Sequence, residues 1–216
     1  TGSGGLTLQG SGVPAEFILN ADTSGYSGLW TVQSAVDNLY VDNGTMNITG
    51  GLSLSTLRAG YNGGTGVVNV LDGAVSIGTG SETMWIGRTD GSSDGDGTVD
   101  FSAASGVILN QSAINIGTSS SSGHGRGTLT LSQAGTNTVT AGTILIGDSN
   151  PAGNTGQTSS LVLGGSDNVF DVGTFTIGGR KSIGEVTIAT GGNFELGSES
   201  ARTALYVGRN NVDTGS

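Results

Sequence analysis

Short runs of alternating apolar and polar residues fill most of the chain, a pattern typical of β-strands with one buried face. One run, apolar-x-apolar-Gly, recurs through the sequence. Its copies are Met84-Trp85-Ile86-Gly87, Ile114-Asn115-Ile116-Gly117, Ile144-Leu145-Ile146-Gly147, Phe175-Thr176-Ile177-Gly178, Leu205-Tyr206-Val207-Gly208 and, more weakly, Leu57-Arg58-Ala59-Gly60. The glycines of successive copies, from Gly60 to Gly208, lie 27, 30, 30, 31 and 30 residues apart. Such regular spacing predicts a repeat protein.

Each repeat contains three alternating segments. In the repeat that ends at Gly117 they are 98–101, 107–109 and 114–116. These runs are too short for helices, and no helical period of 3.6 residues is present. The pattern predicts an all-β, single-stranded β-solenoid, a three-sided β-helix with about thirty residues in each coil and about seven coils. We expect a single solenoid segment over 1–216, with a less regular coil at 1–37 and regular repeats at 38–216. A two-sheet β-sandwich competes with this prediction, but sandwich strands do not normally repeat at a fixed period.

Stacked coils place equivalent positions of successive repeats in columns. We expect one buried column, the core ladder, to contain Ile86, Ile116, Ile146, Ile177 and Val207. Restricted β-branched side chains suit such a ladder. The glycine after each ladder residue permits a sharp corner, because glycine adopts positive φ without a Cβ clash.

The same strands carry a second, outward column of residues. Its predicted members are Arg58, Trp85, Asn115, Leu145, Thr176 and Tyr206. Trp85, Leu145 and Tyr206 form a candidate lateral contact face, because exposed apolar patches mark contacts with protein or with sugar. Alternatively, a neighbouring chain or a further part of this one covers that face.

Composition narrows the functions that the fold can serve. Glycine supplies 42 of 216 residues without a G-X-Y period, which excludes collagen, and the absence of cysteine excludes disulfides and thiolate metal sites. With 17 acidic against 7 basic residues, the net charge of −10 argues against nucleic acid as a partner. No apolar stretch is long enough to predict a membrane span.

The apolar-x-apolar-Gly run, called the anchor motif below, and the strand that precedes it resemble those of a known group of proteins. Gly127-Thr128-Leu129-Thr130-Leu131 and Ile144-Leu145-Ile146-Gly147 carry the resemblance, which extends over about 38–216. They are similar to the glycine-rich β-strand repeats of bacterial autotransporter passenger domains and of surface proteins with a PEP-CTERM sorting signal. The resemblance implies a solenoid at the cell surface or outside the cell, used as a stalk, adhesin or filament.

Two groups of acidic residues are candidates for chemistry. Asp90, Asp94 and Asp96 lie in one Gly/Ser-rich loop and offer the oxygen ligands that Ca²⁺ prefers, although the loop is no EF-hand; the alternative is a solvated turn. Asp171 and Glu195 occupy similar positions in Phe-acid-apolar-Gly runs, so stacking predicts a carboxylate pair at a separation typical of retaining glycosidases. The alternative is two solvent-facing acids. His124, the only histidine, is expected in an exposed loop.

From these patterns we expect a structural or adhesive extracellular protein without enzymatic activity or a required cofactor. The alternative is a β-helix protein that binds or degrades polysaccharide. Both ends of the sequence lack a polar cap, and joined tail to head they recreate the phase of the repeat. We therefore expect end-to-end self-association, or a longer solenoid of which this chain is a processed form or a fragment.

Overall fold

The computed structural model describes residues 4–9, 15–21, 23, 26, 28–33, 36–149 and 157–208. Within these residues the secondary structure is all β, and no helix is present that is long and apolar enough to cross a membrane. The strands are β1 (Leu6–Leu8), β2 (Ala15–Asn20), β3 (Trp30–Val32), β4 (Val36–Ile48), β5 (Leu52–Leu54), β6 (Thr56–Tyr61), β7 (Thr65–Val70), β8 (Ala74–Ile77), β9 (Thr83–Thr89), β10 (Gly95–Asp100), β11 (Gly106–Ser119), β12 (Gly125–Thr130), β13 (Asn137–Ser149), β14 (Thr158–Leu163), β15 (Asp167–Ile177), β16 (Ile183–Ile188), β17 (Asn193–Leu196) and β18 (Ala204–Val207).

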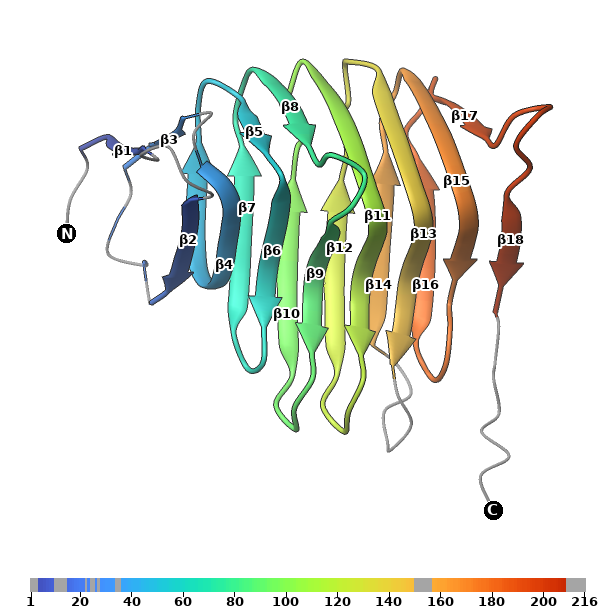
Figure 1. The fold of residues 1–216 in the computed structure, drawn as a ribbon, viewed down its shortest axis with the longest axis horizontal. Helices are drawn as coiled ribbons and strands as arrows, with labels where there is room; N and C mark the ends of the chain where they lie inside the picture. The colour runs from blue at the N-terminus through green and yellow to red at the C-terminus, as the bar shows by residue number, and fades with distance from the viewer. Residues whose placement is uncertain are drawn as a thin grey trace.

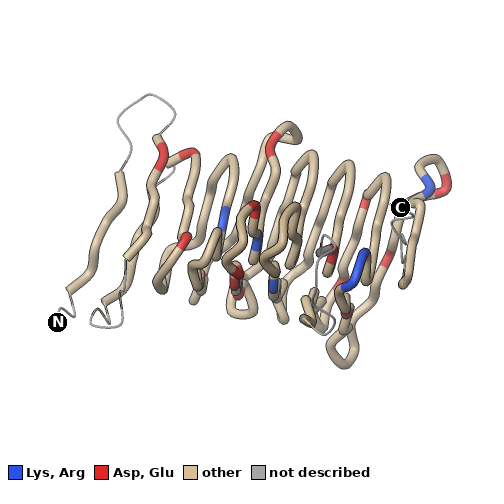
Figure 2. Tube along the Cα trace, turned by 90° about the horizontal axis from the view of Figure 1, so that it is seen from below, with Lys and Arg blue, Asp and Glu red and all other residues tan. Residues whose placement is uncertain are grey.

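The strands stack in parallel along the long axis of the molecule. β7, β10, β12, β14 and β16 pair in succession, and β9, β11, β13 and β15 pair in succession on the opposite side. Figure 1 shows the first group running upward and the second running downward, while Figure 2 shows the same coils side by side from below, with few charged positions. This parallel, all-β arrangement agrees with the predicted solenoid-like β-helical fold.

The strand register confirms the thirty-residue step only in the later part of the chain. Ile116 pairs with Ile86 on one side and with Ile146 on the other, thirty residues away in each direction. Nearer the N-terminus the step is shorter, since Met46 pairs with Val68 only 22 residues later. Regular thirty-residue repeats therefore begin later than the predicted residue 38. The early coil is shorter throughout, since only residues 49–64 separate β4 from β7, whereas residues 101–124, including the long β11, separate β10 from β12.

The predicted core ladder forms, but its last members are not buried. Ile86, Ile116 and Ile146 are completely buried, Ile177 is half-buried, and Val207 is 70% exposed although it pairs in register with Ile177. The prediction of a buried Val207 is therefore wrong. Among the described strands, β18 pairs only with β15, so no neighbouring coil covers its apolar side.

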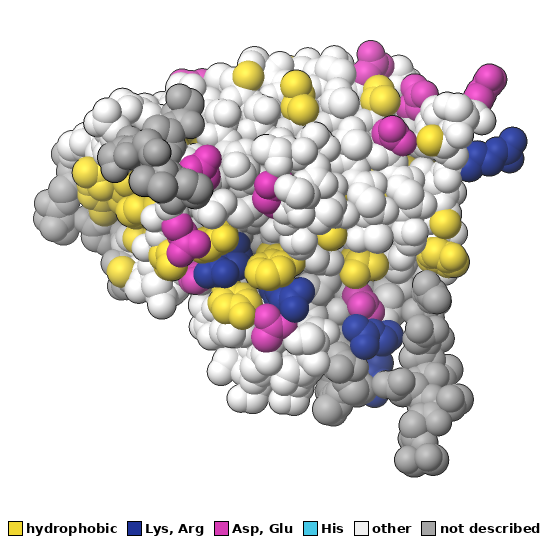
Figure 3. Space-filling model, in the orientation of Figure 1, with side chains coloured by type: hydrophobic (Ala, Val, Ile, Leu, Met, Phe, Trp, Pro, Cys, Tyr) yellow, Lys and Arg dark blue, Asp and Glu magenta, His cyan; other side chains and the backbone are white. Residues whose placement is uncertain are grey.

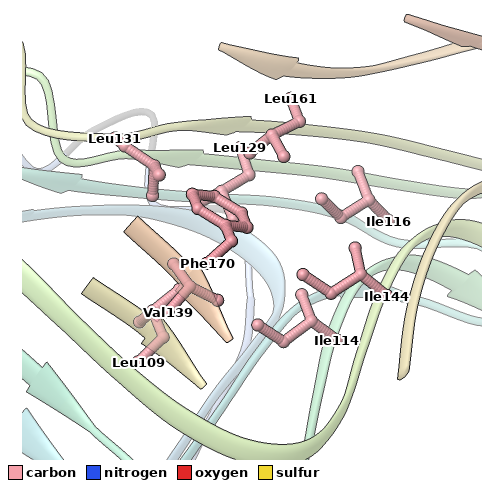
Figure 4. Close-up of a pocket in the computed structure, with 9 residues that line it drawn as sticks. All are labelled: Leu109, Ile114, Ile116, Leu129, Leu131, Val139, Ile144, Leu161 and Phe170. Carbon is pink, nitrogen blue, oxygen red and sulfur yellow. The ribbon is translucent and has the colours of Figure 1, made fainter. Parts of the chain in front are cut away.

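The interior between the two stacks of strands is filled by apolar side chains. Figure 4 shows residues from β11 to β15 pointing toward one another around a central cavity. This cavity measures about 10 Å³, and its lining contains no polar side chain. A space of this size without polar partners does not hold an ordered water molecule. The lining residues are Leu109, Ile114, Ile116, Leu129, Leu131, Val139, Ile144, Leu161 and Phe170.

Buried polar residues are stacked at one bend of the coil and satisfy one another. The Asn137 side chain donates to the Asn168 side chain of the next coil at 2.8 Å. The Asn168 amide in turn donates to the backbone carbonyl of Asn193 at 2.8 Å. These bonds provide partners for backbone and amide groups that would otherwise be buried without them. The bend is thus fixed by coil-to-coil hydrogen bonds.

A glycine with positive φ ends each copy of the apolar-x-apolar-Gly run, and at Gly60 and Gly87 it lies against the backbone of the other stack. Gly60, Gly87, Gly117, Gly147, Gly178 and Gly208 all have φ between 65° and 69°. Pairing resumes after the glycine, with Thr118 opposite Asp148, so the residue kinks a continuing strand and does not end it. A Cβ at Gly87 would lie 1.7 Å from the carbonyl oxygen of Arg126 in β12. Positive φ and backbone contact therefore both require glycine here.

Replacing Gly87 with alanine tests this close approach. We expect Gly87→Ala to destabilise the fold by about 3 kcal/mol or more, because a side chain meets both a disfavoured φ and a backbone clash. Urea denaturation monitored by circular dichroism measures the loss. Gly91→Ala is the matched control, since the nearest atom to a Cβ there is 3.9 Å away and the φ is not in the left-handed region. Equal stability of the two variants would contradict the proposed backbone contact.

Candidate functional site

The outward column predicted from the sequence exists as one continuous row across the coils. Strand pairing joins Tyr40 to Arg58, Arg58 to Trp85, Trp85 to Asn115, Asn115 to Leu145, Leu145 to Thr176 and Thr176 to Tyr206. We call these seven residues the outward column. The predicted contact face of Trp85, Leu145 and Tyr206 therefore lies in a single line.

Exposure varies along the outward column in a regular way. Trp85 and Leu145 are half-buried, and Tyr206 is 39% exposed. Between them, Asn115 and Thr176 are only 8% and 5% exposed, lower than an outward position alone predicts. The small polar side chains are thus recessed between bulky neighbours. Bulky apolar side chains therefore project as ridges on alternate coils, and small polar side chains lie lower between them.

At the N-terminal part of the column, aromatic rings and a guanidinium group are stacked. The Cζ of Arg58 lies 4.1 Å from the ring centroid of Tyr40 and 4.5 Å from that of Tyr61. The same guanidinium donates two hydrogen bonds to Asp42, with Nε–Oδ1 2.6 Å and Nη2–Oδ2 2.7 Å. Cation–π and bidentate carboxylate contacts together fix this side chain.

A second arginine repeats this arrangement at Trp85. The Cζ of Arg88 lies 4.6 Å from the Trp85 ring, and its Nη2 lies 2.6 Å from Oδ1 of Asp90. The indole N–H of Trp85 is buried and has no acceptor in the described part of the chain. Figure 3 shows hydrophobic, basic and acidic side chains side by side on this face. Each arginine is neutralised locally, so the face has little net charge.

The sequence did not reveal this arginine–aromatic cluster. Its members Tyr40 and Tyr61 lie in the short coils, where the anchor motif is weak. Leu39-Tyr40-Val41 has the apolar-x-apolar pattern but lacks the following glycine and lies 18 residues before Arg58 in the column. This alternating run is the feature of the sequence from which Tyr40 could have been assigned to the outward column.

The structure does not bring Asp90, Asp94 and Asp96 together as a calcium site. Asp90 accepts a hydrogen bond from Ser120 at 2.6 Å, and Asp94 accepts one from the backbone N–H of His124 at 2.9 Å. In the residues that the structure describes, no group of three His, Cys, Asp or Glu side chains is placed to hold a metal ion. The carboxylates instead bond to residues thirty positions later, in the next coil.

His124 and Arg126 are the partners of the other two carboxylates. His124 Nδ1 lies 2.8 Å from Asp94 Oδ1, and its side chain is only 18% exposed, so the expectation of an exposed loop histidine is wrong. Arg126 contacts Asp96 through Nε at 2.9 Å and Nη2 at 2.8 Å. These pairs join neighbouring coils along the loop edge of the solenoid.

The proposed carboxylate pair of Asp171 and Glu195 is not formed. Glu195 pairs with Val169, and Asp171 pairs with Thr140 of the preceding coil. The register differs from the predicted one by two residues. A shift of two keeps every side chain on its own face, so the alternating pattern does not distinguish the two registers.

Hydrogen bonding lowers the pKa of two carboxyl groups in the acidic loop. The Arg88 guanidinium beside Asp90, helped by the hydroxyls of Ser120 and Tyr61, lowers the pKa of that carboxyl to about 2. The backbone N–H of His124 lowers the pKa of Asp94. Burial, and then the hydrogen bond to Asp90, raises the pKa of Tyr61. The ionised form of Asp90 therefore favours the folded state.

Removing the charge of Asp90 tests its role between the coils. A carboxyl with a lowered pKa stabilises the fold above its ordinary pKa of 3.8, and this contribution is lost as the pH falls toward about 2. We expect Asp90→Asn to reduce stability at pH 7 by up to about 1 kcal/mol, because exposed pairs are screened by water. The deficit should vanish between pH 4 and 2 in denaturation curves. Asp171→Asn is the control, an exposed carboxylate for which the described residues offer no hydrogen-bond partner; an equal, pH-independent effect of both variants would contradict the assignment.

Comparison with known proteins adds no relative. No family model matches the chain, and neither a curated protein nor a solved structure matches it. The resemblance to autotransporter and PEP-CTERM-type repeats stays a prediction from the sequence.

Proposed function

We propose that this protein is a structural or adhesive element of the extracellular or cell-surface space, a stiff solenoid within a fibre, filament or stalk. Its coils are three-sided, and about seven of them stack along the axis. The main support is the end of the described solenoid that β16, β17 and β18 form. There, side chains in inward columns are exposed, although their partners in the preceding coil are buried.

Three residues at this end illustrate the uncovered core. Ile188 is 45% exposed and pairs with buried Leu163, while Leu205 is 52% exposed and pairs with buried Phe175. Val207 is 70% exposed. Inward apolar side chains gain stability only when a further coil covers them. Unpaired parallel strand edges at the same end are templates for that coil.

The opposite end of the described chain presents the same kind of surface. Leu6 pairs with Trp30 and Leu8 pairs with Val32, so β1 continues an apolar column. Leu6 is 45% exposed and its partner Trp30 6%, whereas Leu8 in the same strand is already buried at 9%. Further coils of a longer solenoid would cover these ends, and so would identical chains, whose end-to-end contact is heterologous and generates an open filament.

We further propose that the chain is not an enzyme. The central cavity is apolar and too small for a substrate, and the one candidate carboxylate pair is separated by the strand register. We expect assays of glycan hydrolysis to be negative and unchanged by Glu195→Gln. Reproducible turnover that this substitution abolishes would contradict the proposal.

A charge placed on the open end tests the structural role. We expect the full chain to form filaments in electron micrographs, with a fibre-diffraction spacing near ~4.8 Å along the axis. Val207→Asp should abolish assembly, because a carboxylate cannot enter an apolar contact without a partner. Ile108→Asp, which adds the same charge on a side position that is 54% exposed, should leave assembly intact. A strictly monomeric full chain, or filaments that tolerate Val207→Asp, would refute end-to-end stacking.

A further inference from the structure

The outward column changes character on every second coil. From Arg58 onward, polar and apolar residues alternate in the order Arg58, Trp85, Asn115, Leu145, Thr176, Tyr206. Adjacent coils lie roughly 4.8 Å apart, so the ridges of Trp85, Leu145 and Tyr206 repeat at about 9.6 Å. A ligand that matches this row is extended, runs along the solenoid axis and has a repeat of two units.

We propose that the outward column binds an uncharged β-1,4-linked glycan chain. Successive sugars of such a chain are turned by about half a rotation, so the same sugar face recurs with every second residue. The C–H bonds of a pyranose ring carry slight positive charge and pack against the negative face of an aromatic ring, at Tyr206 and at the face of Trp85 that Arg88 does not cover, whereas Leu145 provides an aliphatic contact. Asn115 and Thr176, placed between the ridges, provide hydrogen-bonding groups opposite the intervening sugars.

Charge on this face favours a neutral ligand. Arg58 and Arg88 are each bonded to a carboxylate, Asp42 and Asp90, so neither presents an uncompensated cation to an acidic polymer. The chain as a whole carries a net charge of −10, which repels polyanions.

The dimensions of the row favour a single polymer chain over a protein. Four coil steps separate Trp85 from Tyr206, about 19 Å at ~4.8 Å each, and the bulky side chains of the row form a single column. Stable protein interfaces bury about 800 Å² on each partner, which needs a much broader patch. This inference gives a partner class to the adhesive part of the proposed function and does not depend on end-to-end growth.

Tryptophan fluorescence provides a direct readout. The chain contains two tryptophans, Trp30 and Trp85, and Trp30 is buried against Phe17 and Tyr26. In a Trp30→Phe background the emission comes from Trp85 alone. We expect a saturable shift of this emission with cellohexaose, and none with maltohexaose, whose α-1,4 linkage curls the chain, or with polygalacturonate, which is charged. No shift with cellohexaose or chitohexaose, or an equal shift with maltohexaose, would overturn the proposal.

Calorimetry on otherwise native chains separates the site from the fold and from assembly. We expect Trp85→Ala and Leu145→Ala each to weaken cellohexaose binding about tenfold or more, with Ile108→Ala, an exposed apolar residue outside the outward column, as the unchanged control. Retained thermal unfolding curves exclude misfolding of the variants. The Val207→Asp variant should lose end-to-end assembly and keep glycan binding, whereas Trp85→Ala should lose glycan binding and keep assembly. The assembly proposal and the glycan proposal can therefore fail independently. If Ile108→Ala weakened cellohexaose binding as much as Trp85→Ala, the site would be refuted. Lateral association of chains without glycan that Trp85→Ala abolishes would also refute it, because the row would then bind a protein partner.

Discussion

Parallel stacking in register is the constraint on which this molecule depends. Each side chain lies between the equivalent side chains of the coils before and after it, so burial is supplied by neighbours and not by the coil itself. Ile146 and Val207 demonstrate this, since they occupy the same column and the same alternating strand position. Ile146 has a coil on both sides and is completely buried, whereas Val207 has one among the described strands and is 70% exposed. The assembly that we propose therefore has the same physical origin as the stability of the fold.

A second requirement follows because the two stacks of strands must approach each other for the coil to close. At Gly87 and Gly117 the approach is so close that backbone meets backbone, and a left-handed φ redirects the strand. Opposite Gly117, the other stack carries a side chain, that of Ser159 in β14, where a Cβ at Gly117 would lie. The Ser159 hydroxyl accepts a hydrogen bond from the Gly127 N–H at 3.2 Å. A small polar side chain is accommodated by bonding to the backbone it would otherwise crowd.

These two rules explain which features the sequence could predict. Alternation with a thirty-residue period defines which residues share a column, so the ladder of Ile86, Ile116 and Ile146 and the outward row could both be predicted. The 22-residue coils do not follow the thirty-residue period of the apolar-x-apolar-Gly run; their own signal is Gly44 and Gly66, and Gly51 and Gly73, each 22 residues apart. The pairing of β17, shifted by two residues from the predicted register, and the contacts of Arg58 depend on loop lengths and side-chain packing. Neither of these changes the alternation of apolar and polar residues, so the alternation could not predict them.

The inward and outward columns are built by the same stacking, yet they differ in kind. Most inward positions are apolar, aliphatic or aromatic, and they fill the interior as close packing requires. Steric crowding does not explain the alternation outside, since Tyr40, Arg58 and Trp85 are bulky residues on consecutive coils of the same column. Arg58 even lies 4.1 Å from the Tyr40 ring without strain on the register. Large side chains therefore fit next to one another there, and the recessed Asn115 and Thr176 are not demanded by the fold. This surface pattern, which packing does not require and whose spacing is set by the coils, is the observation on which the proposed binding of a repeating polymer rests.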